Sequence, residues 1–174
     1  MNSATMMPAG IAIALAVCAT AYDLRTRRIP NMLTFGGAAV ALAYHGVFGG
    51  TAGLATSLGG WLLGIALFFP FFALRGLGGG DVKLLGALGA WMGPFAVLYI
   101  GLYSTLAGGI FAVAVALRTG YLRQALANLK FLGSFWLTVG FHPAEGVTLD
   151  QKGTPRLAYA VPMLAGLLVT LWLQ

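Results

Sequence analysis

The chain is a succession of long apolar stretches separated by short polar or glycine-rich breaks. At a rise of 1.5 Å per residue, most of these stretches are long enough to cross the hydrocarbon core of a bilayer as helices. They show no alternation of apolar and polar positions, so helices rather than barrel strands are expected. The pattern predicts six transmembrane helices, over about residues 4–22, 32–48, 54–74, 81–93, 95–117 and 157–173.

The breaks between these stretches carry local signals of their own. Proline disfavours helix at the residue before it, so Ile29-Pro30-Asn31 predicts a short turn, after which Asn31 can cap the next helix. Gly49-Gly50-Thr51 predicts a second turn, and Gly93-Pro94 ends the fourth helix. Small residues let membrane helices approach closely, and such contacts are expected at Gly60, Gly64, Gly86, Gly89 and Gly93.

Composition agrees with an integral membrane protein. The chain is 59% hydrophobic and only 8% charged, too few charges to cover the surface of a soluble domain. A net charge of +6 could suggest nucleic acid, but the basic residues stand in short groups between apolar stretches, which membrane topology explains better. The expected environment is therefore the lipid bilayer, without a nucleic-acid partner.

The basic groups also orient the chain. The positive-inside rule places the arginines that follow residue 22, together with Arg75 and Arg118, on the cytoplasmic side. Both termini are then expected on the outer side of the membrane. The N-terminal stretch has no basic residue before its apolar run, so it is interpreted as the first membrane helix rather than a cleavable signal peptide.

The only extended polar stretch covers residues 118–156 and is expected to be a cytoplasmic loop. Within it, residues 121–137 mix bulky apolar side chains with Arg123, Gln124, Asn128 and Lys130. This pattern is typical of an amphipathic helix on a membrane surface, and an ordinary apolar loop is the alternative. No separate domain can be cut from the sequence, so residues 1–174 are expected to form a single membrane domain.

The chain has only four acidic residues, Asp23, Asp81, Glu145 and Asp150. Asp23 closes the first predicted helix and Asp81 opens the fourth, so both are expected at the cytoplasmic edge of the bilayer. Ionisable groups at such positions are candidates for function. Gly78-Gly79-Gly80 before Asp81 can adopt positive φ and approach another segment closely. Structural alternatives are a helix cap for Asp81 and an ion pair with Arg27 for Asp23.

Two carboxyl groups brought close together share one proton, which allows one to deprotonate water while the other polarises a carbonyl group. Other catalytic sets are less well supported. Cys18 is the only cysteine, which excludes a thiolate zinc cluster. His45 and His142 are predicted on opposite sides of the membrane and are interpreted as structural or solvated. No metal and no cofactor are expected.

Three stretches resemble one known family. They are Asp23 with the following Arg27-Arg28-Ile29-Pro30-Asn31, then Gly78-Gly79-Gly80-Asp81-Val82-Lys83-Leu84, and the C-terminal run from Tyr159 to Gly166. Together they resemble the type IV prepilin peptidases, which are aspartic membrane proteases of the GxGD type, and in particular the small form that accompanies tight-adherence (Flp-type) pili. The resemblance covers nearly the whole chain.

This resemblance implies a function. Asp23 and Asp81 would be the catalytic pair, and the substrate would be the short basic leader of a pilin-like precursor, cut on the cytoplasmic side. The residues of the matching motifs that would support the pair are Gly78, Gly79, Gly80, Lys83, Pro30 and Asn31. Larger members of the family carry a cytoplasmic cysteine-bearing domain associated with N-methylation, and this sequence shows none, so methyl transfer is not expected.

Several alternatives stay open at the level of sequence. Glu145 and Asp150 are hypothesised to hold the basic leader, and a solvated loop is the structural alternative. Lys83 either raises the local positive potential or extends to the membrane interface. An intramembrane protease of the presenilin or signal-peptide-peptidase type would also pair Tyr22-Asp23 with a GxGD motif. A non-enzymatic ion- or proton-conducting membrane protein would instead need acids at mid-depth in the bilayer.

Overall fold

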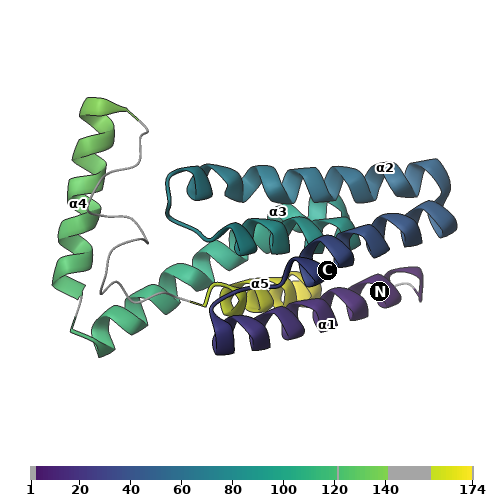
Figure 1. The fold of residues 1–174 in the computed structure, drawn as a ribbon, viewed down its shortest axis with the longest axis horizontal. Helices are drawn as coiled ribbons and strands as arrows, with labels where there is room; N and C mark the ends of the chain where they lie inside the picture. The colour runs from purple at the N-terminus through teal and green to yellow at the C-terminus, as the bar shows by residue number, and fades with distance from the viewer. Residues whose placement is uncertain (1–2, 121, 141–157, 174) are drawn as a thin grey trace.

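A computed structural model describes residues 3–120, 122–140 and 158–173, which are nearly all helical and include no strand. The elements are α1 (Ser3–Thr26), a π-helical turn η1 (Met32–Gly36), α2 (Gly37–Ala73), α3 (Gly79–Arg118), α4 (Leu122–Val139) and α5 (Ala160–Leu173) (Figure 1). The all-α prediction is confirmed for this part of the chain.

Three helical stretches of the described residues are long and apolar enough to cross a membrane. They cover Met6–Thr26, Met32–Ala73 and Gly79–Arg118, and α5 is a shorter apolar helix. The second and third of these stretches are broken where the sequence predicted breaks. The backbone leaves the helical region at Gly50 (φ 61°, ψ −152°) and at Gly93 (φ 82°, ψ 173°). Both φ angles lie in the left-handed region that favours glycine.

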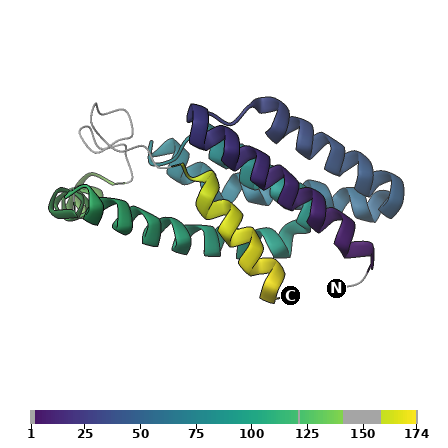
Figure 2. The same ribbon diagram turned by 90° about the horizontal axis from the view of Figure 1, so that it is seen from below.

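The chain folds back on itself at both breaks. Gly53 lies against the carbonyl group of His45, and Gly89 lies against the Val97 side chain. Each of the two long helices therefore consists of two legs, which Figures 1 and 2 show running back alongside one another. We call residues 37–49 and 51–73 the first and second legs of α2, and residues 79–92 and 94–118 the first and second legs of α3.

The second leg of α2 packs against the first leg of α3 through glycines. A Cβ atom at Gly60 would overlap the Gly89 carbonyl oxygen, and one at Gly89 would overlap the Gly60 carbonyl oxygen. At Gly64 an added Cβ would lie 2.6 Å from the Leu85 carbonyl oxygen, which is closer than real Cβ contacts come. The predicted small-residue contact is thus confirmed as contact between two backbones.

Two carbonyl oxygens next to the break in α3 form hydrogen bonds with side chains of α2. Pro94 has no N–H to donate to the Ala90 carbonyl group four residues earlier. The buried Ser57 hydroxyl donates to that carbonyl oxygen instead, at 2.8 Å. The next carbonyl oxygen, that of Trp91, lies 3.2 Å from Nε2 of His45. His45 and Ser57 therefore serve the fold, which agrees with the predicted structural role of His45.

The short helix α5 completes the bundle by packing against α1 and α3. An added Cβ at Gly166 would overlap the Ser104 side chain, so α5 crosses the second leg of α3 at close range. The buried core around this crossing is aliphatic and includes Leu85, Ile100, Met163 and Leu167. Packing of these side chains holds α5 in place against α3.

Helix α4 differs from the others in direction. It runs across the axis of the bundle at one end, as the two views in Figures 1 and 2 agree. Its exposed apolar side chains include Leu126 and Leu137, which are 52% and 89% exposed. The helix predicted over residues 121–137 is confirmed as Leu122–Val139, and its position on a membrane surface stays a prediction.

Candidate active site

Asp23 lies in the last turn of α1 and only 7% of its surface is exposed. Its Oδ2 atom accepts a hydrogen bond from the backbone N–H of Ala160, the first residue of α5, at 3.3 Å. One turn earlier, the Thr20 hydroxyl donates to the carbonyl oxygen of the same alanine at 3.1 Å. The first N–H groups of a helix have no partner within it, so Asp23 satisfies one of those of α5.

Asp81 is the third residue of α3. Its Oδ2 atom accepts a hydrogen bond from the backbone N–H of Gly78 at 3.2 Å. Gly78 is the N-cap residue, so Asp81 does not occupy the cap position proposed as a structural alternative. It reaches back to the cap from the first turn, as the acid of a capping box does. A negative charge in this turn is also favoured by the helix dipole.

An added side chain would be crowded at each of the three glycines before Asp81. A Cβ atom would lie 3.0 Å from Asp81 Oδ2 at Gly78, 3.3 Å from the Phe72 ring at Gly79 and 3.3 Å from Ile29 at Gly80. None of the three has positive φ. The predicted close approach is correct, whereas the predicted use of positive φ is wrong, because the loop backbone is extended or helical at these positions and only side-chain volume is excluded.

The turn after α1 meets the start of α3. Lys83 Nζ donates to Asn31 Oδ1 at 3.0 Å and lies 5.1 Å from the centre of the Phe35 ring. The carbonyl oxygen of Pro30 accepts the N–H groups that open η1. The predicted cap by Asn31 is wrong, because its side chain makes no cap hydrogen bond to η1 and is engaged by Lys83 instead. The residues of the two predicted motifs are thus in direct contact.

Asp23 in the last turn of α1 and Asp81 in the first turn of α3 lie near enough for the charge of Asp23 to act on Asp81. The end of α1 and the beginnings of α3 and α5 lie at the same end of the bundle (Figure 1). The structure therefore brings the two predicted acids to one place, each held by a backbone N–H group. Two carboxyl groups that approach closely can act together on one water molecule, one accepting its proton and the other donating a hydrogen bond.

Tyr159 is a further residue of this site to which the sequence assigned no role. It immediately precedes α5, whose first N–H group donates to Asp23. Its ring packs edge-on against Phe68 of α2, with 5.8 Å between ring centroids. Its hydroxyl lies 3.4 Å from the carbonyl oxygen of Ser104 on α3. The only sequence signal was its place at the start of the C-terminal motif.

The structure does not test the remaining site predictions. Glu145 and Asp150 lie outside the described residues, as does His142. Within the described residues, no three His, Cys, Asp or Glu side chains are grouped as metal ligands would be.

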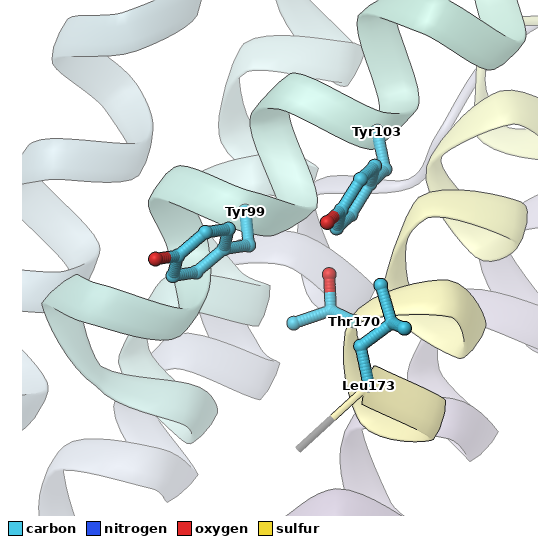
Figure 3. A pocket seen from close by; sticks show the side chains of 4 residues that line it. All are labelled: Tyr99, Tyr103, Thr170 and Leu173. Atoms are coloured by element: carbon cyan, nitrogen blue, oxygen red, sulfur yellow. The ribbon is translucent and has the colours of Figure 1, made fainter.

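A cavity of about 330 Å³ lies between α3 and α5 and is lined by Tyr99, Tyr103, Thr170 and Leu173 (Figure 3). The two tyrosine rings stack at 6.4 Å. Thr170 is ten residues from the start of α5, which is about 15 Å along a helix. The cavity is therefore separate from the two acids.

Comparison with known proteins gives one family. The family model described as "Type IV leader peptidase family" matches residues 10–113. A protein of Aeromonas salmonicida (strain A449) named "Prepilin leader peptidase/N-methyltransferase" is 36% identical over 112 residues, which cover 58% of this chain and 37% of that protein. A protein of the same name from Xanthomonas campestris pv. campestris is 34% identical over 105 residues, covering 54% of this chain and 35% of that protein.

The chain therefore matches only about a third of the length of these curated relatives. No solved structure matches it significantly.

Proposed function

This chain belongs to the type IV leader peptidase family, and we propose that it is an aspartic endopeptidase which removes the leader from pilin-like precursors. The observation that carries the proposal is the meeting of Asp23 and Asp81, 58 positions apart in the sequence, at one end of the bundle. The family match favours this activity over ion conduction. It also favours it over an intramembrane protease of the presenilin type.

In the proposed reaction the two carboxyl groups take different roles. The ionised carboxylate accepts a proton from a water molecule, whose oxygen attacks the carbonyl carbon of the scissile peptide bond. The protonated carboxyl group donates a hydrogen bond to the carbonyl oxygen and stabilises the charge that develops there. A proton then passes to the leaving amine as the carbon–nitrogen bond breaks, and the pair returns to its shared-proton state.

The proposed location is the cytoplasmic face of a bacterial inner membrane. The ends of α1, α2 and α3 lie at the same end of the bundle as the two acids (Figure 1). Arg25, Arg75 and Arg118 stand at or next to these ends. The positive-inside rule therefore supports a cytoplasmic position for that end. In this topology α1, the two legs of α2, the two legs of α3, and α5 each cross the bilayer, and both termini are outside.

A cytoplasmic site suits the proposed substrate. A basic leader followed by an apolar helix places its junction at the membrane edge, where the two acids would lie. Helix α4 is proposed to lie along the same surface, because it runs across the bundle (Figure 2) and its apolar side chains include exposed ones. Glu145 and Asp150 are proposed to hold the basic leader. If charge reversal of both acids leaves cleavage unchanged, that part of the proposal is wrong.

Co-expression with a pilin-like precursor tests the function. We expect the wild-type chain to convert the precursor to a shorter form whose new N-terminus lies at the leader junction. Asp23→Asn and Asp81→Asn should each abolish conversion while the protein still inserts in the membrane. Thr56→Val is a suitable control, because Thr56 is exposed and bonds only within its own helix. Conversion by either asparagine variant at the wild-type level would reject the catalytic pair.

A further inference from the structure

We propose that Tyr159 is a positioning residue for the reaction, which holds the first turn of α5 where the Ala160 N–H group meets the Asp23 carboxylate. This inference rests on the proposed function and extends it to a third residue. Tyr159 is separated from Asp23 by 136 positions in the sequence and lies outside both of the acid-bearing motifs.

The contacts of Tyr159 reach both long helices. Its ring packs against Phe68 of the second leg of α2 at 5.8 Å. Its hydroxyl donates to the Ser104 carbonyl oxygen, on the second leg of α3, at 3.4 Å. These contacts from two directions fix the residue that directly precedes α5.

Helix α3 is shaped to accept this ring. A Cβ atom at Gly108 would lie 2.8 Å from the Tyr159 ring and 2.9 Å from its hydroxyl oxygen. The adjacent Gly109 has nothing within 4 Å of an added Cβ. A methyl group at Gly108, unlike one at Gly109, would therefore displace the Tyr159 ring.

The position of Tyr159 is transmitted to Asp23 through Ala160. Ala160 follows Tyr159 directly, and the N–H group of Ala160 donates to Asp23 at 3.3 Å. A shift of this turn would misplace Asp23 relative to Asp81, and misplacement of catalytic groups by about 1 Å can cost about 100-fold in rate.

Kinetics with purified protein and a pilin-like precursor test the inference. Tyr159→Ala is expected to lower kcat by about 10- to 100-fold and to change KM by less than about twofold, because the dyad is displaced while substrate contacts remain. Tyr159→Phe keeps the ring contacts and should retain kcat to within about threefold. Gly108→Ala should lower kcat by about tenfold, whereas Gly109→Ala should cleave like wild type.

A cross-link that does not depend on activity separates this inference from the proposed function. In a Cys18→Ser background, Thr20→Cys and Ala160→Cys place thiols at two residues in contact, so oxidation should join α1 to α5. Gly108→Ala should reduce the yield to less than about half, since disulfide geometry is narrow, and Gly109→Ala should not. If the wild type cleaves no precursor, the proposed function is wrong. The cross-link yield still shows whether the packing of Tyr159 holds α5 against α1.

Two results would overturn the inference. One is a Gly108→Ala variant that matches Gly109→Ala in both kcat and cross-link yield. The other is a Tyr159→Ala variant whose loss of activity lies in KM alone. If Tyr159→Ala does not fold, the two glycine variants decide the matter.

Discussion

At the scale of single residues, buried polar atoms are matched between helices that are far apart in the sequence. Asp23 accepts the N–H of Ala160, 137 positions away, and Ser57 donates to Ala90, 33 positions away. The sequence identified Asp23 because an acid at a membrane edge is costly. Neither partner could be predicted, because each depends on which helices pack together. The loop glycines before Asp81 were predicted to allow positive φ and close approach, and only the close approach is found.

Loss of the Ser57 hydroxyl is expected to destabilise the fold. Ser57→Ala removes the donor to the Ala90 carbonyl oxygen, and Pro94, four residues later, has no N–H group to replace it. We expect a loss of about 1–3 kcal/mol in the free energy of unfolding, measured by thermal or denaturant unfolding in detergent. Thr56→Val is the matched control, since the Thr56 hydroxyl bonds to Ala52 in the same helix and is exposed. Equal stability of the two variants would contradict the role given to Ser57.

At the scale of elements, the breaks at Gly50 and Gly93 decide the architecture. Both were predicted because glycine and proline act locally, and the φ angles of 61° and 82° agree with that reasoning. The π-helical turn Met32–Gly36 was not predicted. An insertion of this kind changes hydrogen bonding without a characteristic residue pattern, so the segment looked like the start of an ordinary helix.

The contact between α2 and α3 provides the prediction at this scale. Gly60→Ala would drive a methyl group into the Gly89 carbonyl oxygen and force the two legs apart. Overpacking of this kind costs about 1–3 kcal/mol, so the midpoint of thermal unfolding in detergent should fall. Gly59→Ala is the neighbouring control, because nothing lies within 4 Å of its added Cβ. If Gly60→Ala is as stable as Gly59→Ala, the backbone contact is not the one described.

At the scale of the whole molecule, the helical class and the positions of the apolar segments were predictable from the sequence. The meeting of the two acids was predicted only as a consequence of shared topology, since both were assigned to one membrane face. The packing that holds Asp23, with Ala160 against its carboxylate and Tyr159 against α2 and α3, arises from tertiary contacts. The helix over Leu122–Val139 was predicted from its composition, while its direction across the bundle was not.

Topology can be tested by labelling with a membrane-impermeant maleimide. In a Cys18→Ser background, a cysteine at exposed Thr51 should react from the periplasmic side, because it lies beside the Gly50 break. A cysteine at exposed Gly76, between α2 and α3, should react only in inverted vesicles. Labelling of both positions from one side would contradict the proposed crossing of the second leg of α2.

Whether Asp23 and Asp81 act as one catalytic pair is tested most directly by kcat/KM for leader cleavage in liposomes. The proteins compared are the purified wild type, Asp23→Asn, Asp81→Asn and the double variant. If the two acids act as one pair, each single variant should lose about 10²- to 10⁴-fold. The double variant should then be no worse than the poorer single one, because residues that act as a unit have non-additive effects. A double variant whose loss is the product of the two single losses would contradict a shared site, as would a single variant with wild-type kcat/KM.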